Sequence, residues 1–194
     1  MSVDQNVFTR EKAFVKFMMR SLDLTAGKSR VAVISYGSTP VDVARFSSSG
    51  DVETIASEVD KMQFVSGRRN ISKALEHAAS LLNKARVSVS KVVVLLTTGS
   101  DLSLVVPSKA LRDYGTDRYV IAIEVGADEE DLTPIVDNPR DIFSITTPQE
   151  LTWRSGYVID ELVKRTSKIC FILAASSLAF NHHSIREFIV FFFF

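Results

Sequence analysis

A run of small polar residues follows the most apolar stretch of the chain, and these residues are the first candidates for chemistry. The stretch Lys91–Leu96 (KVVVLL) holds five consecutive apolar residues, three of them β-branched, and the turn Thr97–Asp101 (TTGSD) follows it. Such a run is typical of a parallel strand buried on both faces. Ligands of open α/β sheets bind at the carboxyl ends of their strands. Any binding site is therefore expected at Thr97–Asp101.

The residue types at this turn do not match known catalytic patterns. The turn has hydroxyls but neither the lysine nor the glycine spacing of a phosphate-binding loop. Gly126 follows a later strand alone, without the glycine pattern of a dinucleotide site. No serine lies in a nucleophile motif, and the single cysteine, Cys170, has no basic partner close in sequence beyond Lys168. The sequence thus gives no support for a Rossmann-type or hydrolase enzyme, and we expect no catalytic residues and no small-molecule substrate.

Composition narrows the class of partner. The chain has 194 residues, 46% hydrophobic and 24% charged, with a formal net charge of zero. This is the size of one domain with a substantial core. The absence of net positive charge argues against nucleic acid or an anionic membrane as partner. A protein partner is the remaining expectation.

Helical and strand patterns alternate along the chain. Helices are expected at 4–22, 52–62, 71–84, 107–114, 128–136 and 148–166, and strands at 30–36, 41–46, 91–96, 119–125 and 142–145. Alternation of this kind predicts a doubly wound, mostly parallel α/β sheet with helices on both faces. The turn at 37–40 predicts a hairpin, which makes Val41–Phe46 an antiparallel edge strand. His77 is expected to face solvent.

The C-terminal residues have a different character. Ile169–Phe180 is apolar but, at 12 residues, too short to span a bilayer, and the chain ends in IVFFFF. An exposed run of phenylalanines is an aggregation hazard. We expect the domain to span residues 1–166 and residues 167–194 to form a hydrophobic tail outside it. This tail is interpreted either as read-through sequence or as the start of a truncated membrane segment.

Four blocks, in order and spacing, carry a family resemblance: RVAVISYGSTPVDVARF, SGRRNISKALEHAASLL, KVVVLLTTGSD and YVIAIEVG. Together they resemble the von Willebrand factor type A (VWA) domain, from about Ser2 to Arg165. Members from the extracellular matrix, such as the A domains of type VI collagen and matrilins, are the most similar in character. The resemblance implies a Rossmann-like sandwich with a metal-ion-dependent adhesion site at the carboxyl end of the sheet. In that site, carboxylate and hydroxyl oxygens hold Mg²⁺, with one position open to the partner's carboxylate.

This chain departs from the family's metal site. Ser2 matches the last serine of the family's D-x-S-x-S motif, whose beginning is absent. Arg69, next to Arg68, stands in place of the threonine, and Thr98 in place of the aspartate. A guanidinium beside Mg²⁺ would be repelled by several kcal/mol at an effective dielectric of ~20. The resemblance therefore predicts no cofactor, no Mg²⁺ and no metal-dependent adhesion.

The same comparison predicts an adhesion face without a metal. Its members are Ser2, Arg68, Arg69, Thr98, Gly99 and Asp101. The two arginines could bind an acidic partner, and Asp101 could act as a displaced ligand, although a solvated loop and a turn residue are the plainer interpretations.

The resemblance also implies that the family's first strand, in the middle of the sheet, is missing here. It would lie between Arg30–Tyr36 and Lys91–Leu96. A fragment or incomplete gene model is one explanation, and Ile169–Phe180 filling the gap is another. We expect a non-catalytic protein-interaction module, extracellular and part of a longer protein. The alternatives are an intracellular VWA scaffold in a multiprotein complex and, more remotely, a Rossmann-type enzyme.

Overall fold

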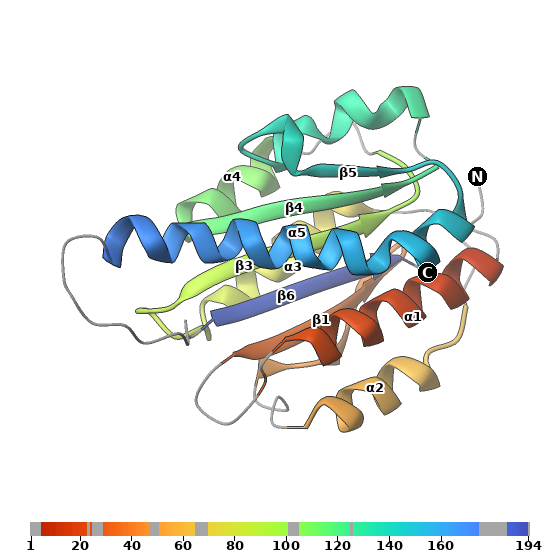
Figure 1. Ribbon diagram of the computed structural model, residues 1–194, viewed down its shortest axis with the longest axis horizontal. Coiled ribbons are helices and arrows are strands. Elements are labelled where there is room, and N and C mark those ends of the chain that lie inside the picture. Colours follow the sequence, from red (N-terminus) through yellow and green to blue (C-terminus); the bar gives the residue numbers. More distant parts are fainter. Residues whose placement is uncertain are drawn as a thin grey trace.

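A single six-stranded sheet organises the chain in the computed structural model (Figure 1). The model describes residues 5–22, 24, 29–46, 51–64, 70–100, 105–124, 126–174 and 186–193. Residues 105, 126–128, 166–174 and 186–193 are described by their backbone only. The strand order is β2-β1-β6-β3-β4-β5. All neighbours pair in parallel except β1 and β2, which form an antiparallel hairpin. The doubly wound fold with one antiparallel edge is therefore confirmed.

The strands end close to where their apolar runs end. Their bounds are β1 Arg30–Tyr36, β2 Pro40–Ala44, β3 Ser90–Thr97, β4 Thr116–Ile123, β5 Ile142–Ile145 and β6 Arg186–Phe193. The last six residues of β1, β3 and β4 are buried. Continuous burial requires cover on both faces, which helices supply.

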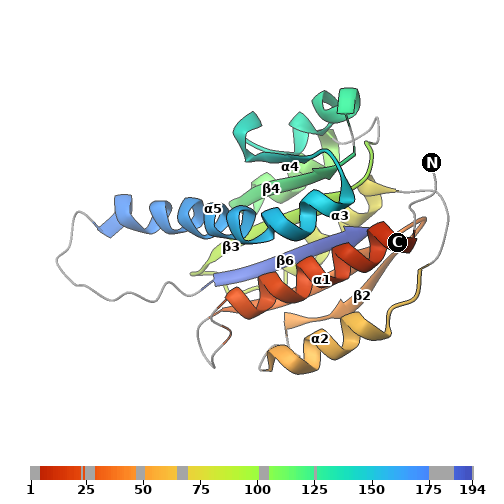
Figure 2. The ribbon, with the colours of Figure 1, turned by 45° about the vertical axis from the view of Figure 1, so that its right-hand side comes forward.

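Two helical layers enclose the sheet (Figures 1 and 2). Helices α1 and α5 lie side by side on the near face, with α2 beside α1, and α3 and α4 lie behind the sheet. Their bounds are α1 Gln5–Ser21, α2 Val52–Lys61, α3 Ile71–Leu82, α4 Val105–Asp113 and α5 Pro148–Ala174. The expected helix at 128–136 is instead a 3-10 helix, η2 Gly126–Ile135, which contains Pro134; a second one, η3, spans Pro139–Asp141.

The centre of the sheet holds the main difference from expectation. Strand β6 lies between β1 and β3, in register from Arg30↔Glu187 to Tyr36↔Phe193 on one side and from Ser90↔Arg186 to Leu95↔Phe191 on the other. The sheet therefore has no missing central strand. The residues after 166 extend α5 and then supply β6, whereas we had expected them to lie outside the domain. Neither neighbour of β6 is left with an unpaired backbone edge there, which is the physical reason for this arrangement.

The segment Ile169–Phe180 does not fill this position. Residues 169–174 continue helix α5, and 175–180 lie outside the described residues. Among the residues that the structure describes, no helix is both long and apolar enough to cross a membrane.

The first turn of α5 is fixed by a reciprocal cap. The Thr147 hydroxyl accepts a hydrogen bond from the Glu150 backbone N–H (3.3 Å), and a Glu150 carboxylate oxygen accepts from the Thr146 N–H and hydroxyl (2.7 Å each). The pattern resembles a capping box, except that Glu150 accepts from Thr146, one residue before the N-cap Thr147. The Thr146 hydroxyl first, and then Arg154, lower the pKa of Glu150 from 4.5 to about 2.

The edge hairpin is tied to α3 by a charged cluster. His77 Nε2 lies 2.6 Å from Asp42 Oδ1, and Arg45 Nε donates to Asp42 Oδ2 at 2.7 Å. Asp42 is buried enough for desolvation to raise its pKa, but its bonds to His77 and Arg45 outweigh this and lower it. The expectation of a solvent-facing His77 is thus wrong: the ring is half-buried and bound to β2.

Candidate functional site

The turn after β3 begins with a buried threonine that folds the chain back on itself. The Thr97 hydroxyl donates to the Gly99 carbonyl (2.8 Å) and accepts from the Gly99 N–H (3.3 Å). Thr97 is fully buried, whereas Thr98, Gly99 and Ser100 are half-buried. The hydroxyl of Thr97 therefore shapes the turn, and the residues after it form the surface at this edge.

The end of β1 reaches the same edge. The Tyr36 hydroxyl donates to the Leu96 carbonyl of β3 at 3.1 Å, beyond the last register pair between β3 and β6. The Gly37 carbonyl accepts from the Asn70 N–H at 2.9 Å, and the Asn70 side chain caps α3 by accepting from the Lys73 N–H. These contacts bring the end of β1, the end of β3 and the start of α3 together.

Acidic side chains of η2 border this edge, and two of them accept hydrogen bonds from serine hydroxyls. Ser100 Oγ donates to Asp131 Oδ2 at 3.1 Å, and the Ser144 hydroxyl donates to Glu129. Glu124, after β4, has a left-handed backbone (φ 56°), and its N–H donates to the Ile145 carbonyl. Within the described ranges, no three His, Cys, Asp or Glu side chains are grouped closely enough to hold a metal ion.

The structure places two of the predicted face residues. Thr98 and Gly99 lie at the carboxyl end of β3, where the parallel-sheet argument put them. Ser2, Arg68, Arg69 and Asp101 lie outside the described residues. Their neighbours in the chain are placed, however, because Phe64 and Asn70 bracket the arginines and Gln5 follows Ser2.

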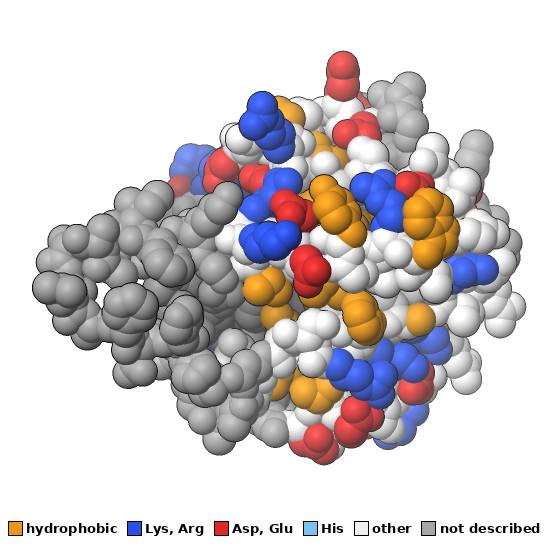
Figure 3. All heavy atoms as spheres, in the orientation of Figure 1, with side chains coloured by type: hydrophobic (Ala, Val, Ile, Leu, Met, Phe, Trp, Pro, Cys, Tyr) orange, Lys and Arg blue, Asp and Glu red, His pale blue; other side chains and the backbone are white. Residues whose placement is uncertain are grey.

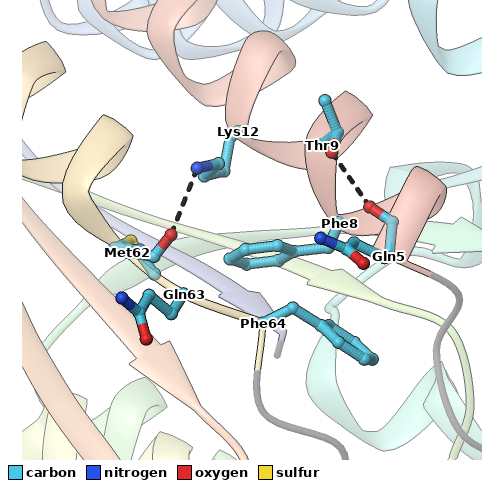
Figure 4. A pocket seen from close by; sticks show the side chains of 7 residues that line it. All are labelled: Gln5, Phe8, Thr9, Lys12, Met62, Gln63 and Phe64. Atoms are coloured by element: carbon cyan, nitrogen blue, oxygen red, sulfur yellow. Dashed lines mark hydrogen bonds between the residues drawn. The ribbon is translucent and has the colours of Figure 1, made fainter.

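A pocket between α1 and the segment after α2 was not predicted from the sequence (Figure 4). Its volume is about 370 Å³, and its lining residues are Gln5, Phe8, Thr9, Lys12, Met62, Gln63 and Phe64. The rings of Phe8 and Phe64 are tilted with centroids 5.9 Å apart, and Lys12 Nζ lies 5.2 Å from the Phe8 centroid. Lys12 also donates to the Asp60 and Met62 carbonyls, both at 3.2 Å.

The pocket is lined by Gln5 and Phe64, which are described residues close in sequence to Ser2 and to the two arginines, respectively. A cation above an aromatic ring is attracted to the ring face. Lys12 therefore places a positive charge in the pocket above the ring of Phe8. The sequence carried one signal, the phenylalanine Phe8 on the apolar stripe of α1. The pairing of Phe8 with Phe64, 56 positions later, depends on packing that periodicity does not show.

The fold and this edge define a class, the Rossmann-like α/β sandwich with its binding face at the carboxyl ends of parallel strands. Within that class, the family model of the von Willebrand factor type A domain matches residues 1–154. The chain belongs to the VWA domain family.

Relatives and solved structures agree with this assignment. The chain is 24% identical over 169 residues to von Willebrand factor A domain-containing protein 2 of Xenopus laevis, covering 84% of this chain and 21% of that protein. It is 24% identical over 155 residues to Cuticlin-6 of Caenorhabditis elegans, covering 77% and 27%. The match thus spans only 21% and 27% of the length of these two relatives.

Two solved structures share the fold. Proximal thread matrix protein 1 from the mussel byssus superposes with a TM-score of 0.73 at 19% identity, over 81% of this chain and 43% of that chain. The pilus adhesin SpaC of Lactobacillus rhamnosus GG gives 0.67 at 12% identity, over 81% and 28%.

Proposed function

We propose that this VWA domain is a non-catalytic protein-binding module of the extracellular matrix that binds its partner without a metal ion. The observation that carries the proposal is Thr98, which directly follows β3 at the position where the resemblance places the aspartate of the family's metal site. A neutral hydroxyl supplies no negative charge to Mg²⁺, which binds through one or two carboxylates in most protein sites. The carboxylates near this edge, Asp131 and Glu129, already accept hydrogen bonds from serines.

Positive charge replaces the metal in this proposal. Arg68 and Arg69 follow Phe64 closely in sequence, and Phe64 lines the same pocket as Lys12. Fixed guanidinium groups bind carboxylates in a forked, two-bond geometry. A partner's acidic side chain, which in a metal-dependent domain completes the coordination of Mg²⁺, would here bind arginine directly.

The extracellular setting is inferred from the relatives. One similar structure is that of a thread matrix protein of the mussel byssus, and one similar sequence is that of Cuticlin-6. The intracellular scaffold is an alternative outcome of the test below.

Calorimetry on the whole chain tests whether it binds a divalent metal ion. Titration with Mg²⁺, Mn²⁺ and Zn²⁺ is expected to give no saturable heat. The byssus protein, whose metal site has been solved with zinc bound, serves as the positive control. Saturable binding that is lost in a Thr98→Val variant would overturn the metal-free site.

Binding of the chain to immobilised purified matrix proteins, measured with Mg²⁺ and again with EDTA, tests whether the partner is a matrix protein that binds without a metal ion. Binding of the same strength in both buffers is expected, with a loss in Arg68→Ala/Arg69→Ala. Lys109→Ala, a change of an exposed cation on α4, is the matched control. Binding only with Mg²⁺, or binding to none of the matrix proteins, contradicts the proposal.

A further inference from the structure

The outer face of α5 carries an exposed aromatic pair. Trp153 is 74% exposed and Tyr157, one turn later, 55% exposed. In Figure 3 hydrophobic side chains gather on the near face among charged ones, over the region where α5 and α1 lie. Large exposed aromatic residues are enriched at protein interfaces, because one of their surfaces is apolar while the polar edge can bond.

Tyr157 is held in place by its neighbours. The Arg154 guanidinium lies 5.6 Å from the centroid of the Tyr157 ring and pairs with Glu150 at 2.6 Å. Glu150 is in turn fixed by the cap of the helix. A ring that is already ordered loses less conformational entropy on binding, which favours association.

A glycine lies within the helix beside these rings. Gly156 is exposed, and a Cβ built on it would meet no atom within 4 Å. Glycine weakens a helix interior relative to alanine, and the described part of this chain gives no packing reason for it. Its effect on the surface is a notch next to Tyr157.

We propose that α5 is a self-association helix, and that two copies of this chain pack through it in an antiparallel, two-fold arrangement centred between Gly156 and Tyr157. In this arrangement each Tyr157 ring fills the notch over Gly156 of the second copy. A two-fold interface requires such a self-complementary surface, with knob and hole on the same helix.

The same two-fold rotation also brings complementary polar residues of α5 opposite one another. Trp153 then faces Asp160 of the second copy, and Gln149 faces Lys164; all four side chains are exposed in the monomer. The indole N–H is a donor only and a carboxylate an acceptor only. No like charges meet. The exposed face of α5 thus supplies both the Tyr157 ring and the notch at Gly156, and both a hydrogen-bond donor and its acceptor. For this reason a second copy fits the face better than an unrelated partner.

Sedimentation and tryptophan fluorescence on the whole chain test this proposal. Trp153 is the single tryptophan, so the emission reports this face alone. A single pair of helix faces makes an interface of the small, weak class, with a dissociation constant of about 1 mM or somewhat below. We expect the average mass to approach twice that of the monomer, with a parallel blue shift of the emission.

Substitutions separate this interface from other contacts. Gly156→Leu should fold, because the added side chain meets open space and favours helix, yet it fills the notch and should raise the dissociation constant at least about tenfold. Gln149→Glu adds an ion pair with Lys164 and should lower the constant about two- to fivefold. Val106→Ser, which removes a 76% exposed apolar side chain of α4, should change nothing.

Three results would overturn the proposal. One is a mass that stays monomeric up to about 1 mM. Another is association with unchanged emission. The third is association that Gly156→Leu leaves intact, since the chain would then associate through a different surface.

Discussion

Proline in the central strand is the sharpest test of the sheet. Val190 of β6 is in register with Val33 of β1 and with Val94 of β3. A proline there removes a ladder hydrogen bond and forces its ring against a paired backbone, which costs about 3 kcal/mol or more. Total stabilities of domains are only about 5–15 kcal/mol. Val190→Pro should therefore lower the melting temperature by roughly 6–12 °C or more.

Urea unfolding followed by circular dichroism measures this loss, and Val87→Pro is the matched control. Val87 is 94% exposed in the turn before β3, so its replacement should change the free energy of unfolding by no more than about 0.5 kcal/mol. If Val190→Pro is equally mild, β6 is not a member of the sheet. The domain would then end near residue 166, as the sequence analysis expected.

Three further predictions follow from buried or capping groups. Tyr36→Phe leaves the buried Leu96 carbonyl without its donor and should cost about 1–3 kcal/mol in urea unfolding; no change would mean that water replaces the hydroxyl. Because the pKa of Glu150 is about 2 folded and 4.5 as the reference, its stabilisation is fully present above about pH 5 and lost as the pH falls toward about 2. The stability difference between wild type and Glu150→Gln should shrink over that interval, and a constant difference refutes the cap. Arg118→Met removes the guanidinium that donates to the Ile135 carbonyl at 2.8 Å and leaves this acceptor unsatisfied; urea unfolding should show a loss of about 1–3 kcal/mol, and a stabilised variant would contradict it.

Local patterns predicted much of this fold. Strand β1 was expected with its observed bounds, because six of its seven residues are buried on both faces and the apolar run is uninterrupted. Strand β4 begins earlier than expected, at Thr116-Asp117-Arg118, because Arg118 is buried. Its guanidinium bonds to the Thr116 and Ile135 carbonyls and pairs with Asp137. These partners are brought together by folding and leave no local signal.

The C-terminal strand could not be assigned from its own residues. The run IVFFFF satisfies the pattern of a fully buried strand and that of an aggregation-prone end equally well. The two interpretations differ in whether the run pairs with other strands. It does so here because β1 and β3 both have edges open to it, which is a property of the tertiary structure. The site was predicted in part for a similar reason: the ends of parallel strands locate Thr98, but only packing creates the pocket between Phe8 and Phe64.

The position of β6 has a consequence for how this protein is made. The strand at the middle of the sheet is translated after all the other strands of the sheet, so the core cannot be completed before β6 has been made. In register, its pairing partners β1 and β3 are 157 and 96 positions upstream, and contacts of such long sequence separation slow folding. Before β6 is made, the edges of the apolar strands β1 and β3 that face it are unpaired. Unpaired strand edges of this kind promote aggregation. Yield in cells should therefore depend on chaperones that hold the nascent chain.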